Sequence, residues 1–284
     1  MALERDEGKI LVCCAVPESD LVIEADIDVD DDFLGYPIED FEATVVAIDD
    51  LSPTIKGIRF ELDHPMQFQA GQYINIDLPG VEGARAFSIA NKPSDNGVLE
   101  LHVRRVPDGA GTGYVHEQMQ VGETLHLSGP YGQFFTRKSA PEDLIFIAGG
   151  SGLSSPQSMV LDLLEHGDSR KITLLQGARN LSELYNRELF EQLAAEHDNF
   201  TYVPALDAPL EEDDWEGFSG YVHEAAIDHF GGQFAGHKAY LCGPPPMIDA
   251  AITALMQGRL FERDIYMERF LTAADGADSG TRSA

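Results

Sequence analysis

Cysteine, basic residues and long apolar runs are all scarce in this chain of 284 residues. Its 3 cysteines, two adjacent at Cys13 and Cys14 and one at Cys242, cannot form a disulfide framework, which points to a reducing compartment. No stretch approaches the ~20 uninterrupted apolar residues of a membrane helix. The apolar run Ile10–Val16 also lacks the basic leader and the cleavage site of a signal peptide. We therefore expect a cytoplasmic protein that does not enter a membrane.

The charge is strongly one-sided, with 49 Asp and Glu residues against 19 Lys and Arg and a formal net charge of −30. Binding to nucleic acid or to an anionic membrane depends on Lys and Arg side chains that neutralise phosphates, so both functions are excluded. Two interpretations of the acidic excess stay open. Either it solvates the surface in general, as in a salt-rich organism, or it forms a docking face that steers a basic partner.

Before residue 140, apolar residues alternate with polar ones, which is the pattern of half-buried strands. The alternating residues are Ile58, Phe60 and Leu62; Ile74, Ile76 and Leu78; Leu99, Leu101 and Val103; and Leu125 and Leu127. Turn signals such as Asp95-Asn96-Gly97 separate these stretches. Short strands at this spacing predict a small antiparallel β-barrel over residues 38–138.

After residue 140 the order becomes strand, glycine loop, helix and strand. The strands are expected at Leu144–Ala148, Ile172–Leu175, Phe200–Val203 and Ala239–Cys242, and the helices around Met159–Leu164, Tyr185–Leu193 and Ile248–Leu255. Such alternation predicts an α/β domain with a doubly wound parallel sheet, covered on both faces, over residues 139–272. Residues 273–284 are expected to form a flexible tail.

The tetrad Arg85-Ala86-Phe87-Ser88, preceded by QAGQY at 69–73, resembles the flavin-binding signature of the ferredoxin–NADP reductase superfamily. The resemblance implies that Arg85 pairs with the FAD pyrophosphate, that Phe87 packs on the flavin and that Ser88 bonds the flavin N5. A planar guanidinium suits bidentate phosphate contacts, and a hydroxyl both donates and accepts hydrogen bonds. Taken alone, the tetrad is also a pattern that arises by chance in strands.

The segment Gly109-Ala110-Gly111-Thr112 resembles the Gly-x-x-Ser/Thr element of the same superfamily. There, backbone amides and a hydroxyl hold the flavin pyrophosphate at a helix N-terminus, where the dipole favours anions. The alternative is an ordinary glycine turn with Thr112 as a helix cap. The resemblance also assigns His102 and Val103, in the strand before this segment, to the FAD site.

The segment AGGSGL at 148–153 closes an expected strand and opens an expected helix, the context in which a glycine loop is meaningful. It departs from the Gly-x-Gly-x-x-Gly fingerprint because Ser155 stands in place of the third glycine. Leu153 excludes the Gly-x-Ser-x-Gly nucleophile elbow of hydrolases. The segment matches the superfamily's Gly-Gly-x-Gly-Leu loop, so the resemblance assigns nicotinamide dinucleotide binding to Gly149, Gly150, Ser151 and Gly152.

Two segments near the C-terminus complete the resemblance. Cys242-Gly243-Pro244 is similar to the superfamily's Cys-Gly-Pro segment, whose cysteine lies near the nicotinamide C4, although a strand-end cysteine is also commonly a small buried apolar residue. Glu268 and Phe270 resemble the acidic and aromatic residues of the last strand, which relay a proton and cover the flavin ring. A last strand needs no function to carry these two residue types, so that alternative stays open as well.

Gly177 and Arg179 end the second expected parallel strand, where the resemblance places the adenosine ribose of NAD. Superfamily members that select NADP gather basic residues there to meet the 2′-phosphate. In this chain Arg179 and Arg187 lie among Glu183 and Glu188, which favours NADH.

The segment at 8–20 resembles the closing part of a plant-type ferredoxin, in which one cysteine, here Cys13, is the fourth ligand of a [2Fe–2S] cluster. Such a cluster needs four thiolates, and no residue before Cys13 supplies the other three. We therefore interpret residues 1–37 as the end of a ferredoxin domain followed by a linker with the acidic run Asp26–Asp32. A full-length parent protein is expected to carry the rest of that domain and the cluster.

Together these motifs are similar to those of reductase components of phenol hydroxylase-like and toluene monooxygenase-like systems. The resemblance implies hydride transfer from NADH to FAD, then single electrons to an iron–sulfur centre and a hydroxylase partner, with Ser88, Cys242 and Glu268 as catalytic residues. Two alternatives stay open: a stand-alone flavin or ferredoxin reductase, and a non-catalytic FAD-binding subunit that uses no nicotinamide. The sequence does not identify the aromatic substrate.

Overall fold

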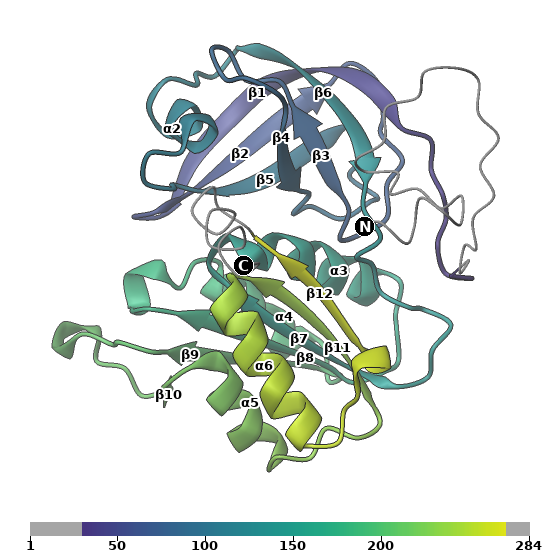
Figure 1. Ribbon diagram of the computed structural model, residues 1–284, viewed down its shortest axis with the longest axis vertical. Coiled ribbons are helices and arrows are strands. Elements are labelled where there is room, and N and C mark those ends of the chain that lie inside the picture. Colours follow the sequence, from purple (N-terminus) through teal and green to yellow (C-terminus); the bar gives the residue numbers. More distant parts are fainter. Residues whose placement is uncertain (1–29, 271–284) are drawn as a thin grey trace, which may run out of the picture. The chain divides into compact units, whose positions relative to one another are not determined.

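The computed structural model describes residues 30–270. Its first part is an antiparallel sheet of six strands in the order β4-β3-β6-β1-β2-β5 (Figure 1). The strands are β1 (Glu39–Ser52), β2 (Ile55–Leu62), β3 (Tyr73–Ile76), β4 (Arg85–Ser88), β5 (Val98–Arg104) and β6 (Thr124–Tyr131). A bridge between Ile89 and Leu101 joins the end of β4 to β5, so the two outer strands meet and the sheet closes into a barrel.

Inward-facing apolar side chains fill this barrel. Because successive side chains of a strand point to opposite faces, every second residue of each strand can reach the interior. Phe41, Phe60 and Ile74 are among the fully buried members of this core. Helix α2 (Ala110–Glu117) packs on the same core through Tyr114 and Val115.

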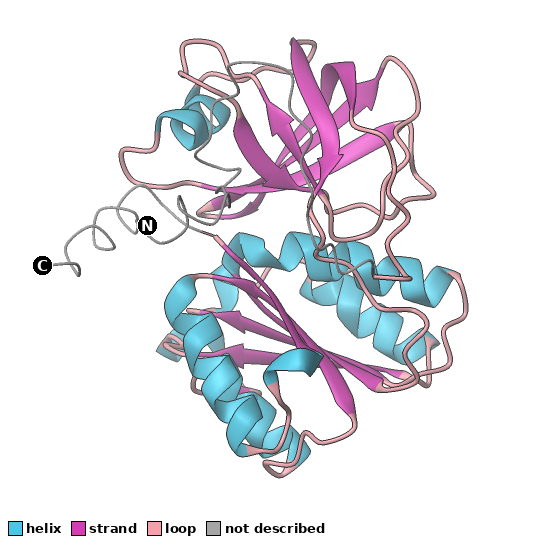
Figure 2. Cartoon of the chain, turned by 45° about the vertical axis from the view of Figure 1, so that its right-hand side comes forward, coloured by secondary structure: helices cyan, strands magenta, loops and turns pink. Residues whose placement is uncertain are grey.

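The second part is a parallel sheet of six strands in the order β10-β9-β8-β7-β11-β12. The strands are β7 (Asp143–Gly149), β8 (Ile172–Ala178), β9 (Phe200–Leu206), β10 (Phe218–Ser219), β11 (His237–Gly243) and β12 (Ile265–Arg269). Helices α3 (Ser154–Glu165) and α4 (Arg187–Glu196) cover one face, and α5 (Val222–Phe230) and α6 (Pro245–Gln257) cover the other (Figure 2). Short 3₁₀ turns lie in the connections: η2 (Gly150–Leu153), η3 (Leu181–Glu183), η4 (Glu211–Asp213) and η5 (Glu262–Asp264).

This architecture confirms the expected antiparallel barrel followed by a doubly wound parallel sheet. Strand β1 and helix α5 were not expected from the sequence. The register of β1 shifts between Val45 and Ala47, which interrupts its alternation, and α5 buries only the small apolar face of Val222, Ala225 and Ala226. Among the described helices, none combines the length and hydropathy that crossing a membrane requires.

Helix α3 contacts both sheets. It packs on one face of the parallel sheet, and its first half lies against the loop that follows β4. Ser158 Oγ donates to the carbonyl of Asn91 at 2.6 Å, and Gln157 Nε2 donates to the carbonyl of Ala90 at 3.3 Å. Gly71, in the loop before β3, approaches the same helix so closely that a Cβ there would lie 2.2 Å from Met159 Cε. These contacts place the end of β4 beside the parallel sheet.

Candidate active site

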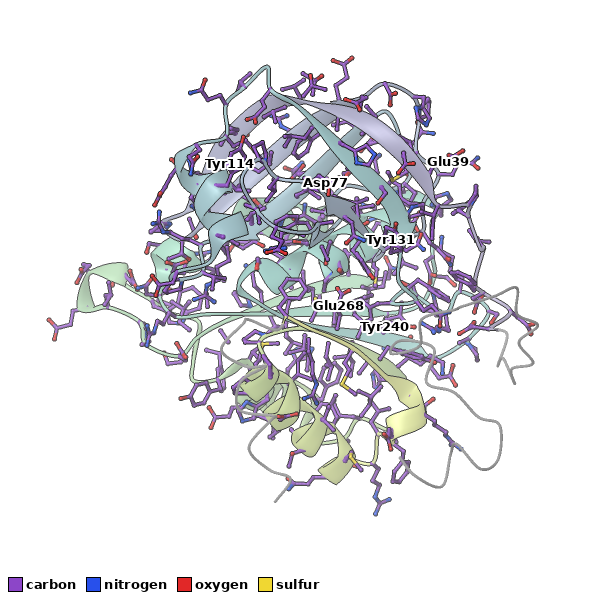
Figure 3. The ribbon with its side chains drawn as sticks, turned by 45° about the horizontal axis from the view of Figure 1, so that its top comes forward. Glu39, Asp77, Tyr114, Tyr131, Tyr240 and Glu268 are labelled. Carbon is purple, nitrogen blue, oxygen red and sulfur yellow. The ribbon has the colours of Figure 1, made fainter. Side chains whose placement is uncertain are left out.

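The carboxylate of Glu268 on β12 is the point where three distant segments of the chain meet (Figure 3 labels Glu268). Its Oε2 accepts hydrogen bonds from Ser88 Oγ at 3.1 Å and from Ser155 Oγ at 3.0 Å, and the Cys242 thiol donates to it at 3.6 Å. These partners belong to β4, to the first turn of α3 and to β11. The structure thus brings the three expected catalytic residues together and adds Ser155, whose only signal in the sequence was its place where a third glycine was expected.

Burial raises the pKa of Glu268 above its ordinary value, although the hydroxyls of Ser155 and Ser88 act in the opposite direction. A carboxyl in such surroundings prefers its neutral form because its charge loses hydration. The pKa of Cys242 is raised as well, first by burial and then by the adjacent Glu268. Cys242 therefore stays a neutral thiol, and Glu268 is the member of the cluster suited to exchanging a proton.

The turn between β7 and α3 lies directly against the end of β11. A Cβ on Gly152 would lie 2.4 Å from the carbonyl oxygen of Cys242, and one on Gly149 would lie 2.5 Å from Met247 Sδ. Gly150 has a φ of +55°, in the left-handed region that favours glycine. Any side chain at these positions would strain or displace the turn. The helix start that follows carries backbone N–H groups without intrahelical partners, an arrangement that holds phosphate groups.

Tyr185 and Arg104 also lie against this turn, although neither was expected at the site. Tyr185 Oη donates to the carbonyl of Gly150 at 3.2 Å and lies 3.2 Å from Nδ1 of His102. The other ring nitrogen of His102 lies 2.9 Å from Glu100 Oε1. An Nη atom of Arg104 comes within 3.1 Å of the place that a Cβ on Gly150 would take. No local motif marks Tyr185, whereas Arg104 stands out as a basic residue at the end of an expected strand.

The two segments that resemble flavin-binding motifs lie against each other. A Cβ on Gly111 would lie 2.9 Å from Arg85 Cγ, so the Arg85 side chain passes directly beside the start of α2. The Arg85 guanidinium donates to three carbonyls of its own preceding loop, two at 2.9 Å and one at 3.2 Å. Thr112 Oγ1 accepts the N–H of Val106 at 3.1 Å and does not cap α2, whose N-cap is Gly109. The helix-cap alternative for Thr112 is therefore wrong, and its hydroxyl instead braces the loop before α2.

Other expected cofactor residues lie within a few residues of one member of the Glu268 cluster in the sequence. Phe87 is partly buried and directly precedes Ser88 on β4. Phe270 follows β12, and its N–H donates to the carbonyl of Gly243 at 3.0 Å. Pro244 is the N-cap residue of α6, and Ser151 is buried within the glycine turn.

Three further expected cofactor residues have contacts outside the Glu268 cluster: Val103, Gly177 and Arg179. The Val103 side chain belongs to the barrel core and is only 2% exposed. Gly177 packs against α5, where a Cβ on it would lie 2.9 Å from Val222 Cβ. Arg179 is exposed after β8, and its carbonyl accepts the N–H of Ala208 at 2.8 Å. None of the three is among the residues that bond Glu268 Oε2 in the described chain.

Cys13 lies outside the described residues, so its assignment as a cluster ligand stays a prediction. Within residues 30–270, no group of three or more His, Cys, Asp or Glu side chains is arranged to hold a metal ion.

Comparisons with known proteins identify the family of this chain. An oxidoreductase FAD-binding domain matches residues 42–136, and an oxidoreductase NAD-binding domain matches residues 146–253. The reductase component of phenol 2-monooxygenase from Pseudomonas sp. (strain CF600) is 68% identical over 100% of this chain and 80% of that protein. This chain belongs to the FAD- and NAD-binding oxidoreductases of the ferredoxin–NADP reductase type.

Two further members of the family are similar to this chain. The phenol hydroxylase P5 protein from Acinetobacter pittii (strain PHEA-2) is 66% identical over 100% of this chain and 80% of that protein. Among solved structures, the cytochrome P450 reductase GcoB from Amycolatopsis has a TM-score of 0.78 at 32% identity, over 84% of this chain and 71% of that chain.

As a member of this family, the chain is a flavoprotein oxidoreductase with FAD and NADH as its cofactors. Its residues fit both groups. The glycine turn at 149–152 carries no side chain at three of its four positions and leads into a helix start, where backbone N–H groups can bind a pyrophosphate. Arg85 and Gly111 place a guanidinium beside a second helix start in the barrel.

We expect Glu268→Gln to be more stable than the parent protein at neutral pH, with a difference that shrinks as the pH falls. A carboxyl whose pKa is raised by folding contributes stability below its ordinary pKa of 4.5 and loses that contribution as the pH rises through the raised value. The amide removes this dependence and still accepts hydrogen bonds from the serines. Urea unfolding between about pH 5 and pH 8 measures the effect.

Glu61→Gln is the matched control, because Glu61 is exposed on β2. It should leave the pH dependence of unfolding unchanged. A Glu268→Gln protein whose stability follows the same pH curve as the parent would contradict the assignment.

Proposed function

We propose that this chain is the reductase component of a multicomponent aromatic monooxygenase of the phenol hydroxylase type. It takes hydride from NADH, passes electrons singly to an iron–sulfur centre and through it serves a hydroxylase partner. The observation that carries the proposal is the Glu268 cluster, in which Ser88 of the barrel and Cys242 of the parallel sheet share one carboxylate oxygen. The relatives that are 68% and 66% identical are themselves components of phenol monooxygenase systems.

In this proposal residues 38–138 hold FAD, residues 139–272 hold NADH, and the reaction takes place in the cytoplasm. The redox chemistry comes from bound FAD, which can accept two electrons together and release them one at a time. Arg85, Gly109, Gly111 and Thr112 would hold the FAD pyrophosphate, and Phe87 and Phe270 would pack on the flavin. The glycine turn would hold the NADH pyrophosphate, and the Arg104 guanidinium would supply a counter-charge. Ser88 and Glu268 hold a proton at the boundary of the two sheets, and the neutral Cys242 thiol adds no charge beside it.

Anaerobic addition of NADH to the FAD-loaded protein tests the function, because reduction bleaches the visible absorbance of the flavin. Bleaching by NADH supports the reductase function, whereas a flavin that NADH leaves oxidised would favour a non-catalytic subunit. Ser88→Ala removes one donor to Glu268. It should keep FAD bound and slow flavin reduction on the order of tenfold or more in stopped flow.

Ser94→Ala is the control for this variant, since the Ser94 hydroxyl donates to Glu165 and not to Glu268. Its reduction rate should equal that of the parent. Equal rates for Ser88→Ala and the parent would remove Ser88 from the mechanism.

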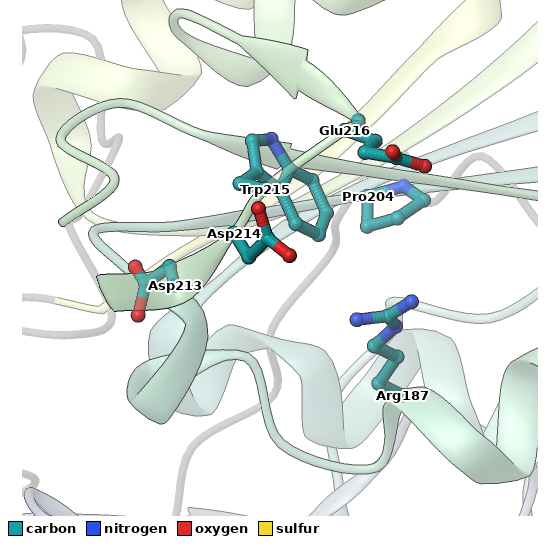
Figure 4. A pocket seen from close by; sticks show the side chains of 7 residues that line it. Arg187, Pro204, Asp213, Asp214, Trp215 and Glu216 are labelled. Carbon is teal, nitrogen blue, oxygen red and sulfur yellow. The ribbon is translucent and has the colours of Figure 1, made fainter. Parts of the chain in front are cut away.

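We also propose that the adenosine end of NADH occupies a cavity of about 410 Å³ beside Pro204 of β9 (Figure 4). Ligands of open parallel sheets bind beyond the carboxyl ends of the strands. The Arg187 guanidinium lies 5.6 Å from the centroid of the Trp215 ring, so the wall offers two groups that stack on a planar base. The Asp213 carboxylate accepts the N–H of Leu181 at 3.1 Å, which ties this wall to the loop after β8.

Three acidic side chains, Asp213, Asp214 and Glu216, line the same cavity. Their charge repels a 2′-phosphate, which supports NADH rather than NADPH as the donor.

Trp215 is the only tryptophan in the chain, so its fluorescence reports on this cavity directly. Titration with 5′-AMP should change the emission, whereas 2′,5′-ADP should bind at least about tenfold more weakly, which corresponds to about 1.4 kcal/mol. If AMP leaves the emission unchanged while NADH still reduces the flavin, the adenosine site lies elsewhere and the reductase function stands.

A further inference from the structure

Strand β12, which carries Glu268, lies at the edge of the parallel sheet and, among the strands that the structure describes, pairs only with β11. An edge strand has a ladder on one side alone, so its outer side depends on side-chain contacts. Tyr266 and Glu268 are two residues apart on β12 and therefore point to the same face of the sheet. Whatever holds the Tyr266 ring also influences where the Glu268 carboxylate lies.

The Tyr266 ring is held on two sides. On one side the Arg137 guanidinium carbon lies 4.1 Å from the Tyr266 ring centroid. On the other side Tyr266 stacks on Tyr240 of β11, with centroids 5.0 Å apart and planes at 14°. Tyr240 in turn stacks on Phe146 of β7, with centroids 5.2 Å apart. The rings form a column that runs from the edge of the sheet into its core.

Arg137 is itself fixed by the segment that connects the two sheets. Its guanidinium carbon lies 4.0 Å from the centroid of the Phe135 ring, and Nη1 donates to the carbonyl of Phe135 at 2.6 Å. Its backbone N–H donates to Tyr240 Oη at 2.9 Å. The guanidinium is thus sandwiched between Phe135 and Tyr266, and a planar group suits this place because it stacks on both aromatic faces.

We propose that Arg137 is a positioning residue for Glu268: by stacking on Tyr266 it holds the edge strand so that Glu268 meets Ser88, Ser155 and Cys242. This rests on the proposed function for its catalytic consequence. Among the described residues that hydrogen-bond Glu268, the titratable one is Cys242 of β11, and the other two partners are the hydroxyls of β4 and α3. Loss of the stack lets β12 shift, separates Glu268 from these partners and opens the Cys242 thiol to solvent.

Two variants test this role in the full chain with FAD bound. Arg137→Lys keeps the charge but loses the plane, and Arg137→Met loses both. Each should raise the rate at which iodoacetamide alkylates Cys242 at least tenfold. Peptide mass spectrometry measures this rate and separates Cys242 from Cys13 and Cys14. Each should also shift the pH profile of flavin reduction by NADH, because Glu268 loses its hydrogen bonds to Ser88, Ser155 and Cys242.

The matched control is Arg170→Lys. The Arg170 guanidinium donates to the carbonyls of Arg137 and Ala140 at 2.9 and 2.8 Å, so this change weakens the same segment without removing the stack on Tyr266. Tyr266→Phe keeps the ring and should behave like the parent, whereas Tyr266→Leu should reproduce Arg137→Met.

Unchanged alkylation and an unchanged pH profile in both Arg137 variants would overturn the proposal. So would an Arg170→Lys protein that alkylates as fast as Arg137→Lys, because general loosening would then explain the effect. If NADH fails to reduce the flavin of the parent, the proposed function fails, whereas the alkylation rates still decide whether Arg137 positions the strand.

Discussion

Two buried carbonyl groups, those of Ala90 and Asn91, hold the barrel against the parallel sheet. A buried carbonyl without a partner costs about 1–3 kcal/mol, and these two receive their hydrogen bonds from Gln157 and Ser158 of α3. Ser88 lies two residues before Ala90, and Ser155 lies two residues before Gln157. The contact that satisfies the carbonyls therefore also brings both serine hydroxyls to Glu268.

The environment of Glu268 differs from that of most acidic residues in this chain. The formal net charge is −30, and an ordinary surface carboxylate here is hydrated and ionised. Glu268 is largely withdrawn from water, and its hydrogen-bond donors within residues 30–270 are all neutral: two hydroxyls and a thiol. Such surroundings stabilise a proton on the carboxyl without a fixed positive charge, which keeps the group able to give that proton up.

Local patterns predicted the parts of this molecule whose structure is local. The tetrad at Arg85–Ser88 and the glycine turn at 149–152 appear where the sequence placed them, because a strand followed by a glycine turn and a helix start is specified within about ten residues. Strand β1 was missed because a bulge after Val45 interrupts its alternation. Ser155, Tyr185 and Arg137 were missed for another reason. Their decisive partners lie far along the chain, and no spacing within a segment reveals which residue a folded sheet will bring opposite another.

A site assembled from β4, α3, β11 and β12 exists only while barrel and sheet remain docked. Neither sheet contains this site alone. A ligand that contacts both the barrel and the parallel sheet therefore binds the docked arrangement and not the separated one. By mass action, such ligands stabilise the docked arrangement. Bound FAD and NADH would therefore strengthen the same contact between barrel and sheet that brings Ser88 to Glu268.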